Sequence, residues 1–564
     1  MLLVSLNFLI VNQLNQIIMK RFTLGSAMLI VLTTCFLSCK PTKEEATLIP
    51  SYAVTITPVE ADNAPALQSF AHGVNSLDLL LFAGRTNSDS DNGGLHKING
   101  NSNYSSKSFL PPSFNEMIYV YNLESNAAPY TMSMDDMVER LKAYQGAHPG
   151  PGDVAQAIPQ IIAALPTYQT IFRVTNPQVT QDENGFLYVI GGYGTPIGSD
   201  TVSNAYQTFN KVARIHVPSM INLVKNQNLD QIDWWNLIAF GQDSKLMATG
   251  GEVYKLGDTF YLSGGHNFGS SAPLAKDNQQ YQDAVYPFTL KVEPGTINLT
   301  IDVKTAITDV ALADLGTFTA DTTSKFRRRD GPIVPALFYD SNKNLTEGLT
   351  FYGGVFQPGS KGVAPNENPD STYNRAWNTA IYIHPAFGDT NPVPESPYYT
   401  LDSKYNQGNL NVYSCSDIEF YDATTKTVHT LLIGGIGDGQ TQAQTSMLSG
   451  FTNSLMHVTY DLEKGTSTPK LESENIFNTD NFYGAESAFI YNSNANLVFT
   501  QVNGKTTEVI DANATFKSGQ SVDVGYIYGG IEAFNAGPGT YGPGNSAASN
   551  KIWKVTVTKN TVNN

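Results

Sequence analysis

The chain contains few cysteines for its length. Only Cys35, Cys39 and Cys415 occur in 564 residues, and the first two lie within the first forty. The single thiol left in the body of the chain cannot form an internal disulfide, so a disulfide framework is excluded. A large apolar core must therefore stabilise the fold, and a chain of this size can bury one.

Positive charge is also scarce. The chain has 34 Lys and Arg residues and 50 Asp and Glu residues, which gives a formal net charge of -16. The longest basic run is Arg327–Arg329. A strongly acidic protein repels phosphate backbones, so we expect no nucleic-acid partner. Charged residues make up only 15% of the chain and hydrophobic residues 41%, a balance that is typical of globular, strand-rich proteins.

The first forty residues carry an export signal. From Met19, a Lys20-Arg21 pair precedes an apolar run over residues 22–37, which is too short to span a membrane comfortably. The run ends in a Phe-Leu-Ser-Cys sequence at residues 36–39 that resembles a bacterial lipobox. The resemblance implies a lipid on Cys39 and cleavage before it. Residues 32–35 form a weaker alternative, an uncleaved anchor is another, and the complete signal from Met19 makes residues 1–18 an upstream extension.

The residues after Cys39 suggest where the protein is displayed. Lys43-Glu44-Glu45 resembles the export tag of lipoproteins carried to the outer face of some outer membranes, whereas an ordinary solvated linker is the alternative. We expect a signal peptide over residues 1–38, a lipidated linker over 39–51 and one domain over 52–560. The expected partner is the outer membrane, reached through the lipid, with display on the cell surface.

A repeat organises the rest of the chain. Six apolar segments end in a small residue and a glycine, at Gly84, Gly192, Gly265, Gly354, Gly435 and Gly530. A second segment with alternating apolar residues follows each of them, as at residues 117–121 and 552–557. Alternation with a period of two predicts strands with one buried face.

These segments resemble kelch repeats, in which a strand ending in Gly-Gly is the second of a four-stranded blade. The resemblance implies an all-β fold, a six-bladed kelch-type propeller. Residues 328–334 also resemble the kelch entry into a first strand. Residues 52–57 form one further alternating strand, which we expect beside residues 551–557, where it would complete the sixth blade and close the ring.

One insertion is predicted to be helical, at about residues 132–166. Ser133 and Asp136 form a capping-box pattern before an amphipathic stretch. A weaker helix is predicted from Asp153 to Leu165, interrupted by Pro159. We expect both helices between the third and fourth strands of the first blade, as a cap over one side of the propeller rather than a functional lid.

The resemblance to kelch propellers implies that the first strand of each blade lines the central channel. The residues at the start of the expected first strands would then form a ring of acids at one mouth of that channel. Four of the six begin with a carboxylate, and the other two begin near a histidine and near Asn176 or Gln178. Crowded carboxylates raise one another's pKa unless a cation or arginines intervene. The alternative is a set of structural carboxylates bonded to neighbouring backbone. The candidate residues are Glu252, Asp330, Asp417, Glu486 and His72.

The loops that follow the glycine pairs are expected to open at the same mouth. They begin with Arg85, Tyr193 and His266, and Arg328 lies close in sequence to the ring and could neutralise it. Aromatic faces beside polar groups suit sugars, because CH groups stack on the rings while hydroxyls form hydrogen bonds. Tyrosine-rich loops can equally pack on one another.

Two function classes fit this pattern. The first is a surface-exposed lipoprotein that binds a carbohydrate, another small nutrient or a protein partner and could deliver a ligand to an outer-membrane transporter. The second is a carbohydrate-active enzyme at the acidic mouth, either a hydrolase or an enzyme similar to the kelch sialic-acid mutarotases. Binding is favoured, because no nucleophile motif, phosphate loop or metal-ligand spacing is present. The eight histidines occur singly, so we expect no metal and no cofactor. Cys415 is expected as a buried thiol beside the channel.

Overall fold

The computed structural model describes residues 48–86, 109, 113–202, 204–270, 279–309, 324–355, 357, 376–384, 398–407, 412–437, 450–536 and 546–563. The expected signal peptide, Cys39 and the linker up to residue 47 lie outside these residues. Residues 52–559 form one compact unit, to which the following description applies.

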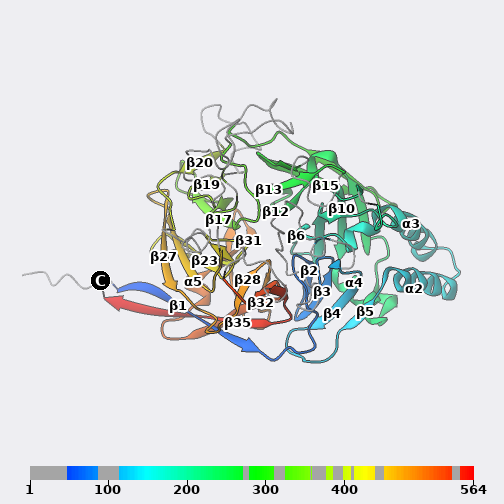
Figure 1. The fold of residues 1–564 in the computed structure, drawn as a ribbon, viewed down its shortest axis with the longest axis horizontal. Coiled ribbons are helices and arrows are strands. Elements are labelled where there is room, and N and C mark those ends of the chain that lie inside the picture. The colour runs from blue at the N-terminus through cyan, green and yellow to red at the C-terminus, as the bar shows by residue number, and fades with distance from the viewer. Residues whose placement is uncertain are drawn as a thin grey trace, which may run out of the picture. The chain divides into compact units, whose positions relative to one another are not determined.

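Six antiparallel units of four strands make up this body (Figure 1). From the inner to the outer strand, the first three are β2 (Ala71–Asn75), β3 (Asp78–Phe82), β4 (Ile118–Asn122), β5 (Tyr130–Met132); β6 (Gln178–Gln181), β7 (Phe186–Ile190), β10 (Lys211–His216), β11 (Ile238–Gln242); and β12 (Thr249–Leu256), β13 (Thr259–Phe268), β15 (Val285–Val292), β16 (Leu299–Val303). The other three are β17 (Ile333–Tyr339), β18 (Leu345–Phe351), β19 (Ala380–Ile383), β20 (Tyr399–Asp402); β22 (Ser416–Asp422), β23 (Thr427–Ile433), β26 (Leu455–Asp461), β27 (Thr466–Ser473); and β29 (Ala488–Tyr491), β32 (Ser521–Tyr528), β35 (Ile552–Asn563), β1 (Leu48–Val59).

Each glycine-ended segment is the second strand of its unit, and each alternating segment is the third, as the sequence predicts. The glycines are needed where neighbouring units approach. Gly434 has φ +66°, and a Cβ built there would lie 2.2 Å from the carbonyl oxygen of Tyr483 in the next unit. Only glycine adopts a positive φ readily and also leaves room for this close approach of the two backbones. The fold is mostly β and consistent with a kelch-like propeller.

The sixth unit takes its outer strand from the N-terminal side of the chain. β1 is hydrogen-bonded to β35, so the strand that contains residues 52–57 lies beside the strand that contains residues 552–557, as the sequence predicts. Tyr52 also reaches the fifth unit, where its hydroxyl donates to Asp422 Oδ2 at 2.5 Å. The two ends of the domain are thus joined.

A hairpin that the sequence does not predict lies between the first and second strands of the sixth unit. It consists of β30 (Phe499–Val502) and β31 (Lys505–Asp511), and β31 pairs in parallel with β22, the inner strand of the fifth unit. The short strands that complete the loops are β8 (Tyr193–Gly194), β9 (Gln207–Thr208), β14 (Gln279–Tyr281), β21 (Val412–Tyr413), β24 (Ile436–Gly437), β25 (Gly450–Phe451), β28 (Phe482–Ala485), β33 (Ile531–Ala533) and β34 (Ser546–Ala548).

The helical insertion comprises α2 (Met134–Ala147) and α3 (Asp153–Tyr168), and the capping box of Ser133 and Asp136 is confirmed. Two expectations were wrong. The helices follow the outer strand β5 instead of preceding it, because β5 is only three residues long and carries no strong pattern. Pro159 does not interrupt α3, whose Ile158 and Ile161 are fully buried. The other helices among the described residues are η3 (Gln169–Phe172), α4 (Val217–Lys225), η4 (Leu229–Gln231), η5 (Ser244–Leu246) and α5 (Ala512–Thr515).

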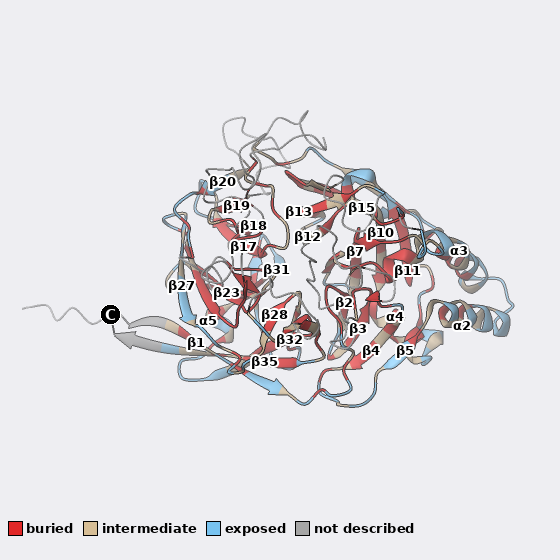
Figure 2. Ribbon diagram, viewed as in Figure 1, coloured by how far each residue is buried: buried red, intermediate tan, exposed pale blue. Residues whose placement is uncertain are grey.

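Buried residues follow the strands of all six units, whereas α2 and α3 show exposed outer faces (Figure 2). The helices pack on the first two units, where Met137, Leu141 and Ile161 join one apolar cluster with Phe82 and Leu187. Within the described part of the chain, no helix has the length and apolar character needed to cross a membrane.

Candidate functional site

Six residues, one at the entrance to each inner strand, are joined by a closed circle of backbone hydrogen bonds. Each amide donates to the carbonyl oxygen of the corresponding residue in the preceding unit. The donor–acceptor pairs are Asn176–Ser69 (3.0 Å), Gly250–Asn176 (3.2 Å), Asp330–Gly250 (2.8 Å), Ser414–Asp330 (2.6 Å), Glu486–Ser414 (3.1 Å) and Ser69–Glu486 (3.3 Å). Because the sixth bond returns to the first unit, the six units close on themselves. We call these residues the inner ring.

All six members of the inner ring have left-handed backbone. Their φ angles lie between 49° and 65°, although only Gly250 is a glycine. A non-glycine residue held in this region costs on the order of 1–3 kcal/mol and is retained where the surrounding structure requires it. Five polar side chains are kept at these positions despite that cost, which directs attention to what the side chains do.

The inner ring surrounds a cavity of about 150 Å³. All six ring residues line it, together with Phe70, His72, Glu252 and Cys415. A cavity of this volume accommodates a group about the size of benzene. Side chains from all six units therefore converge on one small pocket.

Glu486 is bonded into the wall of this pocket. Its Oε2 accepts hydrogen bonds from Ser69 Oγ at 2.7 Å and Asn176 Nδ2 at 2.8 Å, and its Oε1 accepts from Ser414 Oγ at 3.1 Å. The donors come from the first, second and fifth units. Glu486 is therefore bonded into the structure, although its donors are side chains of neighbouring units and not the backbone groups considered from the sequence.

The negative charge of Asp330 is partly neutralised by a neighbouring arginine. Its Oδ2 lies 3.2 Å from Arg329 Nη1. Burial raises the pKa of Asp330 to about 6, while Arg329 opposes that rise and Glu486 adds to it. Asp330 thus lines the pocket as a carboxyl group that titrates close to neutral pH.

Glu252 differs from both acids, since its carboxylate has no hydrogen-bond partner among the described residues although it lines the pocket. Burial raises its pKa well above the usual value, and the negative charges of Asp417, Glu486 and Asp330 raise it further. His72 shares the pocket, and burial lowers its pKa to about 4, so its imidazole is neutral at physiological pH.

Asp417 does not line the pocket but belongs to a deeper group of acids. It shares one face of β22 with Glu419, two residues later, and Glu508 on β31 lies near both. Burial raises the pKa of Asp417 to about 7 and that of Glu508 to about 7. Glu347 of β18 is a further member, with a pKa raised by burial to about 7. We call these four residues the inner acid group.

Arg85 and Arg328 form hydrogen bonds with other groups of the protein. Arg85 is buried, donates to Thr175 Oγ1 and Gln68 Oε1, each at 3.1 Å, and lies 3.8 Å from the ring of Phe109. Burial lowers the pKa of Arg85 to about 9. Arg328 donates to the backbone carbonyls of Lys325, Gly353 and Thr379. Neither arginine lines the pocket.

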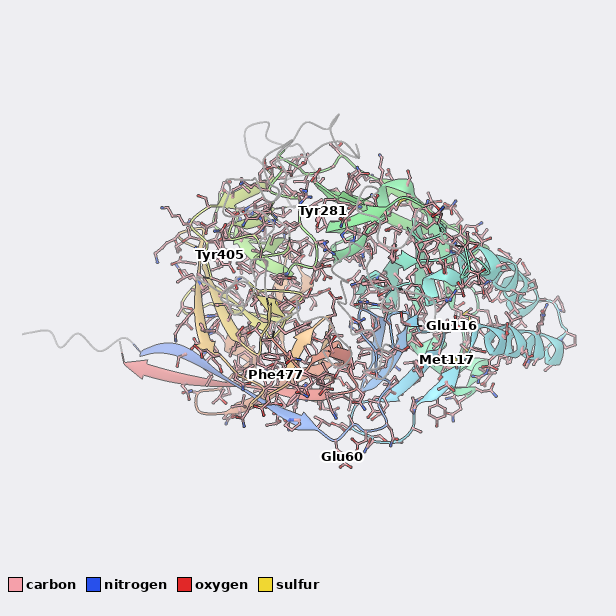
Figure 3. The ribbon with its side chains drawn as sticks, in the orientation of Figure 1. Glu60, Glu116, Met117, Tyr281, Tyr405 and Phe477 are labelled. Atoms are coloured by element: carbon pink, nitrogen blue, oxygen red, sulfur yellow. The ribbon has the colours of Figure 1, made fainter. Side chains whose placement is uncertain are left out.

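His266 and Tyr193 lie in the loop region outside the pocket lining. His266 is buried against Phe268 and Tyr281, with ring centroids 4.9 and 5.7 Å away. Tyr281, labelled in Figure 3, accepts a hydrogen bond from Arg329 Nε at 3.1 Å and so connects this cluster to Asp330. Tyr193 packs on Phe268 at 5.3 Å.

Cys415 lines the pocket as a free thiol. Burial and the nearby Asp417 raise its pKa well above the usual value, so the thiol stays protonated and is a poor nucleophile. Within the described ranges, no three His, Cys, Asp or Glu side chains are placed to hold a metal ion.

Sequence reasoning identified Glu252, Asp330, Glu486 and His72, which the structure brings together, and Asp417, which lies deeper. It missed Ser69, Gly250 and Ser414 of the inner ring, because their types carry no signal of their own. It also missed Glu508 and Glu347. Glu419 could have been found, since it follows Asp417 at the two-residue period of a strand.

Comparison with known proteins gives only a distant similarity. No family model matches the sequence, and no curated protein matches it. Among solved structures, one titled "Structure of YjhT" is similar over 88% of this chain and 99% of that chain, with 10% identity and a TM-score of 0.39.

Proposed function

We propose that this protein is a surface-exposed lipoprotein whose six-bladed kelch-type propeller binds a small polar ligand, a carbohydrate or another small nutrient, in the pocket at the inner ring. One observation carries the proposal: Glu252 lines the pocket with a carboxylate that has no partner among the described residues. Glu252 is half-buried, and its side chain lines the cavity. A bound ligand that donates hydrogen bonds to Glu252 would supply the partners that the described protein groups do not provide.

The composition of the pocket supports a ligand with both polar and apolar faces. Phe70 and His72 offer ring surfaces, while Glu252 and Asp330 offer acceptors. Polar groups converging on a concave site with aromatic walls are typical of small-molecule sites. The volume of about 150 Å³ suits a single sugar ring or a group of similar size.

Lipid attachment at Cys39 is the second part of the proposal and rests on the sequence of residues 19–45 alone. Metabolic labelling with a radioactive or alkynyl fatty acid tests it. Labelled protein is expected from the wild type, and the Cys39→Ser variant should carry no label. Equal labelling of both chains would remove the proposed anchor without affecting the pocket.

A thermal-shift screen of monosaccharides and small metabolites, followed by calorimetry on the hits, tests the pocket. Glu252→Gln is the test variant, and Glu139→Gln on the exposed face of α2 is the matched control. We expect Glu252→Gln to weaken binding at least tenfold and Glu139→Gln to leave it unchanged. Equal binding by all three proteins would discard the pocket as the ligand site.

Acid–base catalysis at the same pocket is a second candidate, supported by one observation. Glu252 and Asp330 have raised pKa values, which would let a carboxylic acid donate a proton near neutral pH. Turnover of a bound sugar, followed by NMR and lost in both Glu252→Gln and Asp330→Asn, would favour the enzyme. Binding without turnover would favour the binding protein.

A further inference from the structure

We infer that the pocket receives its ligand through a positively charged nitrogen group, an ammonium or amidinium, bound against Glu252. This inference rests on the proposed function and names the chemical class of the ligand. The charges around the pocket, the unpartnered side chain of Glu252 and an aromatic wall carry the argument.

The charge balance of the lining is negative. Glu252, Asp330 and Glu486 line the pocket, whereas no lysine or arginine does. From outside the lining, Arg329 Nη1 lies 3.2 Å from Asp330 Oδ2 and the charge of Arg85 acts on Asp330 and Glu486, whose oxygens accept from neutral donors. A cation in the pocket would therefore face acids from three different units of the propeller.

A second polar group beside Glu252 also lacks a partner. Ser263 lies directly opposite Glu252 in the antiparallel pair of β12 and β13, so the two side chains lie on the same face of the sheet. Ser263 is fully buried, and its Oγ has no hydrogen-bond partner. Ser263 lies outside the pocket lining and donates no hydrogen bond to Glu252, so the Glu252 carboxylate is left as the acceptor for an N–H donor group in the pocket.

Asp417 of the inner acid group also acts on Glu252, because its negative charge raises the pKa of Glu252. Glu419 is 2% exposed and its Oε1 has no hydrogen-bond partner. Two lysines offset part of this charge, because Lys255 and Lys505 lower the pKa of Glu347 and Lys255 lowers that of Glu508. Neither lysine lines the pocket.

Phe70 completes the site for a cation. Its ring lines the pocket together with Glu252, and a cation over an aromatic face gains electrostatic attraction that grows when water is excluded. His72 does not oppose the cation, since its imidazole is neutral at physiological pH. An anionic ligand would meet three acidic side chains and no cationic side chain in the lining, whereas a bound cation would favour the ionised form of Glu252.

Two matched pairs of probes test the inference by calorimetry at low salt: glucosamine against glucose, and cyclohexylamine against cyclohexanol. We expect each amine to bind wild-type protein at least tenfold more tightly than its neutral partner. Glu252→Gln should reduce that preference to less than threefold, and Glu139→Gln should keep it. Thermal unfolding of each variant confirms that it is folded.

The outcomes separate the inference from the proposed function. If the amine and the neutral probe bind equally and Glu252→Gln weakens both, the pocket remains the ligand site and the cationic class is overturned. Tighter binding of gluconate than of glucosamine would overturn the class as well. If binding of every probe is unaffected by Glu252→Gln, the proposed pocket itself fails.

Discussion

Ser69 and Glu486 are 417 residues apart in the chain, yet they make two hydrogen bonds with each other. The Ser69 amide donates to the Glu486 carbonyl oxygen at 3.3 Å, and the Ser69 hydroxyl donates to Glu486 Oε2 at 2.7 Å. The first bond closes the inner ring between the first and the last unit. The second places the Glu486 carboxylate where donors from three units meet. Ring closure and pocket geometry thus depend on the same residue.

Glu486→Ala should destabilise the protein. The substitution leaves Ser69, Asn176 and Ser414 without their acceptor. Removing the shared partner of several part-buried donors costs about 1–3 kcal/mol or more. We expect a lower midpoint in urea unfolding, and no change for Glu139→Ala, which alters an exposed carboxylate. Equal midpoints for wild type and Glu486→Ala would show that the side-chain bonds do not stabilise the ring.

Gly434→Ala should destabilise the folded protein far more than Gly504→Ala. Both glycines have positive φ, +66° and +78°, but only the Cβ at Gly434 would approach another atom, the Tyr483 carbonyl oxygen, at 2.2 Å. The Gly504 variant therefore measures backbone strain alone, of order 1–3 kcal/mol. We expect poor expression or a much lower melting temperature for Gly434→Ala. Similar losses for the two variants would contradict the close contact between units.

Tyr52→Phe tests the contact of the N-terminal strand with the fifth unit. The variant removes the hydroxyl that donates to Asp422 and keeps the ring, whose centroid lies 4.6 Å from that of Phe420. Leaving a buried acceptor with one fewer partner should lower the free energy of unfolding by about 1–3 kcal/mol. Tyr130→Phe on the exposed strand β5 is the matched control, for which no loss is expected. A neutral Tyr52→Phe would indicate that the hydroxyl bond to Asp422 does not stabilise the fold, and that ring packing and the pairing with β35 hold the strand.

The buried acids predict that stability falls as pH rises. Burial raises the pKa of Asp330 to about 6 and that of Asp417 to about 7 in the folded state, against about 3.9 for an unfolded aspartate. The folded state therefore holds more protons than the unfolded state between these values, and its stability falls over that window. The contribution is complete below about pH 4 and is lost as the pH passes through 6 and 7.

Melting temperatures from pH 5 to pH 8 check this slope. We expect a decrease for the wild type and a flatter profile for Asp417→Asn, which cannot ionise. Glu139→Gln should keep the wild-type slope. If Asp417→Asn and the wild type show parallel profiles, Asp417 does not titrate in this range.

The fold was largely predictable because its signals are local. The glycine pairs mark second strands, since at Gly434 the backbone has positive φ and the next unit leaves no room for a Cβ. Alternating apolar residues mark the third strands, because each of these strands buries one face. β5 escaped prediction because three residues are too short for a pattern. The pairing of β31 with β22 joins segments about ninety residues apart, and no local pattern encodes it.

The site was predictable only in part. Glu252, Asp330 and Glu486 stand out as carboxylates at strand entrances, whereas Ser69 and Ser414 occupy equivalent ring positions with an ordinary residue type. The ring is formed by backbone N–H groups, which every residue type except proline has, so residue type does not reveal its members. Arg328 was expected near the ligand because it adjoins the ring in sequence. Its guanidinium instead donates to backbone carbonyls inside the fourth unit.

A crystal structure of the protein soaked with the amine that binds most tightly tests the central claim most directly. The account predicts electron density for the ligand within the inner ring, with its nitrogen in hydrogen-bond contact with Glu252 and its carbon skeleton against Phe70. Density at another surface, with an unchanged water-filled pocket at the inner ring, would contradict it.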